Sequence, residues 1–131
     1  MIIDSSALLA ILNNEPERHR LGVAIGAARD RRISAPTLLE TSIVVEARSG
    51  AAGTRDLDEL VASLNLVIVP FNEDHLAFAR EAFRQFGKGQ GHSARLNFGD
   101  CFSYALAKAT GAPLLFKGDD FAKTDIEVAA Y

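Results

Sequence analysis

The sequence predicts an α/β protein in which helices cover both faces of a central, mostly parallel sheet. Short apolar segments typical of β-strands alternate with amphipathic helical segments along the whole chain. No internal repeat, linker or low-complexity segment interrupts this alternation. The chain has 131 residues, of which 48% are hydrophobic, and this suits one compact core. We therefore expect a single domain over residues 1–131.

In the first half of the chain, capping residues and breaks define the expected elements. Asp4 or Ser5 is suited to cap the first helix, and Pro36 suits the first turn of a later one. The Gly50–Gly53 segment predicts a flexible loop between two helices. The predicted elements are a strand at 1–3, helices at 7–12 and 17–28, a strand at 33–35, and helices at 36–49 and 54–64.

The second half contains the clearest strand signal, the apolar run at residues 66–70. Asn72 and Asn97 are suited to open helices, and Gly111 is suited to end the second of them. The other predicted elements are a helix at 72–86, a Gly-rich basic loop at 87–95, a helix at 97–110, a strand at 112–116, a turn at 117–121 and an edge strand at 125–128. In the helix expected at 72–86, the spacing of apolar residues predicts that four side chains face inward: Leu76, Ala79, Phe83 and Phe86.

Composition excludes several classes of protein. The single cysteine, Cys101, allows no internal disulfide and fits a reducing compartment, and its apolar helix face indicates a core residue. No apolar run approaches the ~20 residues that a membrane span requires. Asp4 interrupts the apolar start of the chain, and no basic segment precedes it, so no signal peptide is indicated. We expect a cytoplasmic protein without membrane association.

Acidic residues fall where a parallel α/β sheet places its functional sites, outside the carboxyl ends of the strands. Asp4 follows the first strand, and Asp119 and Asp120 follow the fourth. Glu40 shares a helical stripe with the apolar residues 43, 44 and 47, the stripe expected to face the sheet. Asp100 opens the helix that leads to the fourth strand. The fold therefore offers one place where four carboxylates meet.

Such a cluster favours binding of a divalent cation. Asp100 taken alone is explained by the positive end of its helix dipole, but four carboxylates at close range repel one another unless neutralised. Mg²⁺ or Mn²⁺, as one ion or two, is the natural neutraliser, and it supports phosphodiester hydrolysis. The net charge is −3, so without these four residues the chain would carry +1, which is compatible with a polyanionic substrate. Ser6 is suited either to bind a carboxylate or to cap the helix.

Other acidic-site folds fit less well. A receiver domain needs a carboxylate pair after the first strand, whereas Asp4 stands alone there. A haloacid-dehalogenase-type phosphatase needs a second Asp at the position of Ser6. The glycines around Lys88 follow a helix rather than a strand, so they do not form a phosphate-binding Walker A loop. The histidines lack metal-ligand spacing, and we expect His19 and His75 at the surface.

Five segments of the chain carry a family resemblance when they are taken together. The most specific segment runs from Gly87 to Cys101, and the others are residues 1–6, Glu40, residues 114–121 and residues 124–125. In this order and at this chain length, they resemble PIN-domain ribonucleases, specifically the VapC-type toxins of bacterial toxin–antitoxin pairs. The resemblance implies an α/β/α sandwich, Mg²⁺-dependent endonucleolytic cleavage of RNA to 5′-phosphate and 3′-hydroxyl ends, and inhibition by a VapB-type antitoxin. It also implies a homodimer that forms a heterotetramer or larger assembly with the antitoxin.

The resemblance also implies roles for individual residues. Asp4 and Asp100 would be the principal metal ligands, Glu40 would complete the acidic cluster, and Asp119 would be its fourth member. The spacing before Phe121 allows either Asp119 or Asp120 in that position. We favour Asp119, with Asp120 capping the short turn. Asp125 is either an outer contributor or a turn residue.

Basic residues near these segments are candidates for holding the RNA backbone or are solvated surface: Arg29, Arg31, Arg32, Lys88, His92, Arg95 and Lys117. Two other readings of the chain remain open. One is a non-catalytic PIN scaffold that binds RNA or protein, and the other is a DNA-acting flap-type nuclease, which needs further carboxylates and usually a longer chain.

Overall fold

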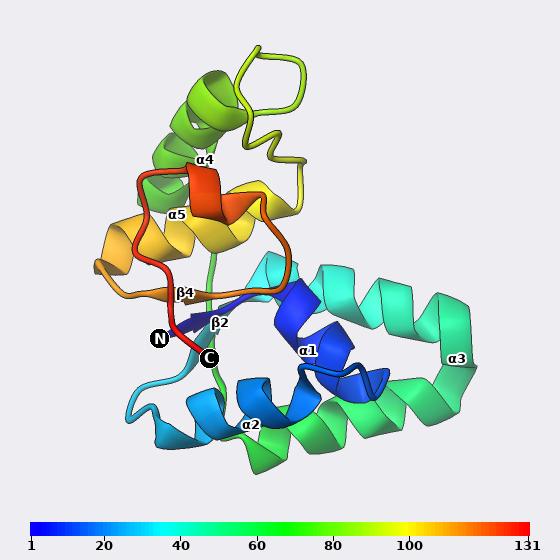
Figure 1. Cartoon of the computed structure of the whole chain (residues 1–131). Helices are drawn as coiled ribbons and strands as arrows, with labels where there is room; N and C mark the ends of the chain where they lie inside the picture. Colours follow the sequence, from blue (N-terminus) through cyan, green and yellow to red (C-terminus); the bar gives the residue numbers. More distant parts are fainter.

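A computed structural model describes residues 1–131 of the chain, and its centre is a four-stranded parallel sheet in the order β3-β2-β1-β4 (Figure 1). The strands are short: β1 is Ile2–Ile3, β2 is Arg32–Ser34, β3 is Val67–Val69 and β4 is Leu114–Leu115. Every pairing between them is parallel. The carboxyl ends of all four strands therefore lie at one edge of the sheet.

Helices lie on both faces of this sheet, which confirms the α/β/α sandwich. Helices α1, α2 and α3 occupy one side in Figure 1, and α4 and α5 occupy the other. Their bounds are Ser5–Leu12 for α1, Arg18–Ala27 for α2, Ala35–Ser63 for α3, Glu73–Phe86 for α4 and Asp100–Thr110 for α5, followed by a short 3₁₀ helix at Phe121–Lys123. No helix is long and apolar enough to cross a membrane.

The two-sided covering follows from the alternation of side chains along each strand. In β1, Ile3 packs into the core formed with α1, α2 and α3, whereas Ile2 packs into the core formed with α4 and α5. In β4, Leu115 and Leu114 divide in the same way. All four side chains are fully buried. In β1 and β4, two residues thus suffice because each residue contributes to a core, whereas Val67 and Ile68 of the edge strand β3 are exposed.

Element boundaries differ from the expectations by more than two residues in three places. Residues 51–53 are helical rather than a loop, and α3 continues through a kink at Gly50, whose backbone alone is non-helical. Residues 125–128 form no strand, since only an isolated bridge joins Val128 to Leu114. The helix α5 begins at Asp100, three residues later than Asn97.

The inward face of α4 also differs from the prediction. Leu76 and Phe83 are 49% and 39% exposed, whereas His75, Ala79, Ala82 and Phe86 are buried. The true inner stripe contains a histidine and two alanines, because α4 packs closely against α5 and small residues permit that approach. Hydrophobicity alone selected larger residues one position away, so the surface placement of His75 was wrong.

The end of α5 provides a test of backbone conformation. Gly111 adopts the left-handed region, with φ of 62°, and nothing lies near a Cβ built there. We predict that Gly111→Ala lowers the free energy of unfolding by about 1 kcal/mol, because a side chain disfavours this conformation. Gly22→Ala, in the interior of α2 and equally unobstructed, is expected to raise it by up to about 1 kcal/mol. Denaturant unfolding of both variants measures the two changes in free energy of unfolding. If both variants were stabilised, or both destabilised, the left-handed conformation assigned to Gly111 would be contradicted.

Candidate active site

Asp4 is a buried carboxylate at the carboxyl end of β1, where it also caps α1. It is 3% exposed and accepts three hydrogen bonds. Its Oδ2 accepts from the Ser6 backbone N–H at 3.0 Å and from the Ser6 hydroxyl at 2.7 Å. Its Oδ1 accepts from the Ser103 hydroxyl at 2.6 Å. Ser6 therefore binds a carboxylate, as one of its two expected roles required, whereas the cap of α1 is Asp4 and not Ser6.

Glu40 lies on α3 at the border between the buried and the open side of that helix. The buried stripe is Thr37, Thr41 and Val45, whereas Ile43 is 61% exposed. The expectation that residues 43, 44 and 47 face the sheet was therefore wrong, because two buried positions are threonines that hydropathy does not single out. Partial burial raises the pKa of Glu40, and the charge of Asp4 raises it further. The Glu40 carboxylate therefore lies within electrostatic range of Asp4.

Gly99 provides the space that the Glu40 carboxyl group occupies. A Cβ built at position 99 would overlap the Glu40 carboxyl group, at 2.6 Å from Oε1. A residue with any side chain at this position would displace Glu40 or the start of α5. Gly99 therefore allows Glu40 on α3 to approach the N-terminus of α5, where Asp100 lies.

Asp100 and Asn97 cap the start of α5 reciprocally. The Asn97 side chain accepts from the Asp100 backbone N–H at 2.9 Å, and the Asp100 side chain accepts from the Asn97 N–H at 2.8 Å. Burial raises the pKa of Asp100 to about 7, against the lowering effect of the bond from Asn97; the charges of Asp4, Asp120 and Glu40 add to the rise. Asp100 is thus at the centre of a group of like charges.

The fourth carboxylate whose charge acts on Asp100 is Asp120, whereas Asp119 has no such effect. Both side chains are exposed, and neither makes a hydrogen bond or ion pair. The charge effect on Asp100 therefore favours Asp120 as the fourth member of the cluster, and the choice between Asp119 and Asp120 stays a prediction. Asp125 lies elsewhere, because it accepts from Tyr104 at 2.6 Å and from Lys108 at 2.8 Å. These bonds make it an anchor of the C-terminal segment on α5.

The donor set of this cluster fits a hard divalent cation. The charges that act on Asp100 and Glu40 are all negative, and the nearby Lys117 is paired with Glu15 and Glu17. No three carboxylates converge closely enough to form a ready cage. Mg²⁺ usually binds through one or two carboxylates and retains several waters, so it does not require a full cage of protein ligands.

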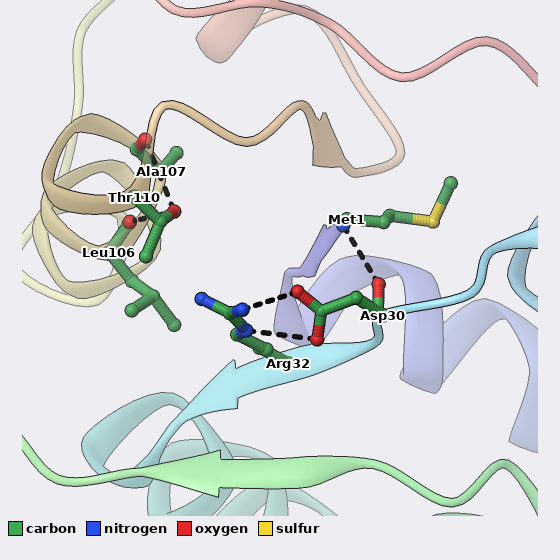
Figure 2. Close-up of polar contacts among 6 residues, drawn as sticks. All are labelled: Met1, Asp30, Arg32, Leu106, Ala107 and Thr110. Atoms are coloured by element: carbon green, nitrogen blue, oxygen red, sulfur yellow. Dashed lines mark hydrogen bonds and ion pairs between the residues drawn. The ribbon is translucent and has the colours of Figure 1, made fainter.

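Most of the candidate RNA-binding cations have structural partners instead. Arg31 donates to the carbonyl oxygens of Gly26, Ala28 and Leu64. Arg32 pairs with Asp30 at 2.5 Å beside the amino group of Met1 (Figure 2), which is the amino end of the sheet and opposite to Asp4.

The Gly-rich loop retains two unpaired cations. The His92 ring packs edge-on against Phe86, and its Nδ1 accepts from the Ala94 N–H. Lys88 and Arg95 are exposed and make no ion pair. These two therefore remain available for a phosphate backbone.

Sequence reasoning missed the hydroxyl groups beneath the carboxylates. Ser103 and Thr37 are fully buried, and their hydroxyl oxygens are 3.2 Å apart. A signal was present in the sequence, since Ser103 follows Asp100 by three positions and Thr37 precedes Glu40 by three. Residues three apart share one face of a helix.

An apolar groove of about 580 Å³ adjoins the cluster between α3 and the start of α5. Glu40 and Gly99 contribute to its wall, so the groove is continuous with the acidic site. Three large side chains along it are strongly exposed: Leu39, Ile43 and Phe98, at 61%, 61% and 79%. Exposed apolar side chains of this extent often mark a contact with another macromolecule.

The fold and the cluster define an α/β/α protein with a carboxylate site at the carboxyl edge of a parallel sheet. A family model described as PIN domain matches residues 1–127. The chain belongs to the PIN-domain family. It is 48% identical over 130 residues to Ribonuclease VapC30 of Mycobacterium tuberculosis, covering 99% of this chain and 98% of that protein. It is also 48% identical over 126 residues to Ribonuclease VapC of Mycolicibacterium smegmatis, covering 96% and 97%.

Solved structures share the fold at low sequence identity. The sarcin–ricin-loop-cleaving toxin VapC20 of Mycobacterium tuberculosis aligns with a TM-score of 0.75 and 20% identity, over 95% of each chain. VapBC2 of Rickettsia felis, solved with a promoter DNA fragment, aligns with a TM-score of 0.76 and 16% identity, over 97% of this chain and 94% of that one. These likenesses support the α/β/α fold.

The raised pKa of Asp100 predicts a pH-dependent stability. Between pH 3.8, its ordinary pKa, and about 7, the folded protein retains a proton that the unfolded chain has released. The free energy of unfolding then falls as pH rises through this window. We predict that wild type loses stability relative to Asp100→Asn over this range in metal-free buffer. Denaturant unfolding at several pH values measures the difference between the two proteins; a difference independent of pH would contradict the burial of Asp100 among like charges.

Proposed function

We propose that this protein is an Mg²⁺-dependent endoribonuclease that acts as the toxin of a toxin–antitoxin pair. The observation that carries the proposal is the cluster of Asp4, Glu40, Asp100 and Asp120. No Lys or Arg side chain offsets the negative charges that act on Asp100 and Glu40. The occurrence of this cluster in a chain 48% identical to named VapC ribonucleases, over nearly their whole length, supports RNA as the substrate.

Each acidic residue has a distinct part in the proposed site. Asp4 and Asp100 hold the cation. Asp4 is buried and held by the Ser103 hydroxyl, and Asp100 lies at the N-terminus of α5. Glu40 and Asp120 add negative charge that strengthens binding of a divalent ion. When bound, Mg²⁺ supplies Lewis-acid stabilisation of the charge that develops on the scissile phosphate. Mn²⁺ is expected to substitute for it, since both ions prefer oxygen ligands.

Lys88 and Arg95 are proposed to hold the RNA backbone. Both belong to the loop that leads into Asp100, and both side chains are free of ion pairs. The RNA is proposed to bind as a single strand or loop, because base-specific recognition favours splayed nucleotides.

The proposed protein partner is a VapB-type antitoxin. The structural neighbours include VapBC2 of Rickettsia felis and a toxin–antitoxin complex from Klebsiella pneumoniae. We propose that the antitoxin covers the apolar groove beside Glu40 and Phe98, since a chain seated there would also block RNA from the carboxylates. A homodimer, and a heterotetramer or larger complex with the antitoxin, are proposed as well.

Cleavage of RNA by purified protein tests the function. We predict cutting in Mg²⁺, none in chelator, and 5′-phosphate ends when the products are sequenced. Asp4→Asn and Asp100→Asn are expected to reduce the rate by at least roughly a hundredfold, because each removes charge from the proposed cation site. Asp120→Asn is expected to reduce it more than Asp119→Asn, since only the Asp120 charge acts on Asp100. Adding the cognate VapB-type antitoxin is expected to stop cleavage.

Asp58→Asn serves as the matched control, because Asp58 is exposed on α3 and makes no ion pair. Cutting by Asp4→Asn at the wild-type rate would refute the assigned site. Absence of Mg²⁺ or Mn²⁺ binding, together with RNA binding without cleavage, would favour the non-catalytic scaffold. Cleavage confined to DNA would favour the flap-type nuclease.

A further inference from the structure

Two fully buried hydroxyl groups form a hydrogen-bonded chain that ends on Asp4. The Ser103 hydroxyl donates to Asp4 Oδ1 at 2.6 Å. The Thr37 hydroxyl lies 3.2 Å from the Ser103 oxygen. A hydroxyl carries one proton, and Ser103 has given its proton to Asp4, so Thr37 must donate to Ser103. The chain therefore runs in one direction, from Thr37 through Ser103 to the carboxylate.

This chain connects the three elements that carry the principal acidic residues. Thr37 is on α3, three residues before Glu40, and Ser103 is on α5, three residues after Asp100. Each hydroxyl thus lies about one turn from the carboxylate on its own helix. The two contacts fix α3 and α5 relative to the end of β1, and with them the spacing of the carboxylates.

The hydroxyl of Ser6 binds the other carboxylate oxygen of Asp4, Oδ2. Ser6 donates to Asp4 Oδ2, and its own oxygen accepts from the Lys117 backbone N–H at 3.0 Å. Oδ2 accepts two hydrogen bonds, whereas Oδ1 accepts only the one from Ser103. Since each carboxylate oxygen has two acceptor positions, Oδ1 retains one for a ligand.

We propose that Thr37 and Ser103 are positioning residues that orient Asp4 so that its Oδ1 coordinates the catalytic cation. This inference rests on the proposed metal-dependent function. Packing alone does not account for the two hydroxyls, because a valine and an alanine would fill the same volume without burying polar groups. The two hydroxyls are explained if Thr37 holds the Ser103 hydroxyl in a fixed position, from which it donates to Asp4 Oδ1.

Substitutions at Thr37 test the inference, with Thr41 as a matched control on the same helix. Thr41 is also fully buried, but its hydroxyl donates to the Thr37 carbonyl oxygen at 2.8 Å and does not contact Asp4. We predict that Thr37→Val weakens Mg²⁺ affinity and RNA cleavage by roughly ten- to a hundredfold, as loss of a partner behind a metal ligand typically does. Thr37→Ser retains the hydroxyl and is expected to behave like wild type, as is Thr41→Val.

Calorimetric titration with Mg²⁺ alone, without RNA, measures the affinity, and thermal unfolding measures stability separately. Ser103→Ala is expected to weaken Mg²⁺ binding at least as much as Thr37→Val, and adding Thr37→Val to it is expected to change nothing further, because Thr37 acts only through Ser103. If Ser103→Ala does not fold, the Thr37 and Thr41 variants still decide the question.

Wild-type Mg²⁺ affinity in Thr37→Val would overturn the inference while leaving the proposed function intact. Equal losses of affinity in Thr37→Val and Thr41→Val would also overturn it, since a general packing effect would then account for both. If wild type neither binds Mg²⁺ nor cleaves RNA, the proposed function fails and the inference fails with it.

Discussion

The buried carboxylate of Asp4 is the constraint that organises the site. A charged group that is 3% exposed is tolerated only where hydrogen-bond donors replace the lost water. Ser6 and Ser103 supply those donors, and each is itself held from behind, Ser6 by the backbone after β4 and Ser103 by Thr37 on α3. Satisfying one carboxylate therefore fixes four parts of the chain that are distant in sequence.

Repulsion among the carboxylates around Asp4 is what suits this site to binding a cation. Gly99 admits Glu40 to the start of α5. Burial is the main cause of the raised pKa of Asp100, and the charges of Asp4, Asp120 and Glu40 raise it further. A group with a pKa of about 7 is readily converted to its ionised form by a bound cation. The carboxylates thus repel one another in the metal-free protein, and we infer that a bound Mg²⁺ ion relieves this repulsion.

Sequence alone was sufficient for the α/β/α architecture and for the position of Asp4 at the carboxyl end of β1, because alternating elements and the carboxyl ends of parallel strands follow simple rules. It did not identify the buried face of α3, where Thr37 and Thr41 occupy positions that hydropathy assigns to solvent. It also did not decide between Asp119 and Asp120, because that choice depends on how the turn after β4 is held. The bond from the Lys117 N–H to Ser6 holds it, and such a contact between residues 111 positions apart leaves no local signal.

The location of a bound cation tests the central claim most directly. Crystals of the protein soaked in Mn²⁺ would reveal the ion by its anomalous scattering. The account predicts a single site or a pair of sites in which Asp4 Oδ1 and an Asp100 carboxylate oxygen lie within coordination distance of the same ion. Mn²⁺ bound only away from Asp4 and Asp100, or no bound ion at saturating concentration, would contradict it.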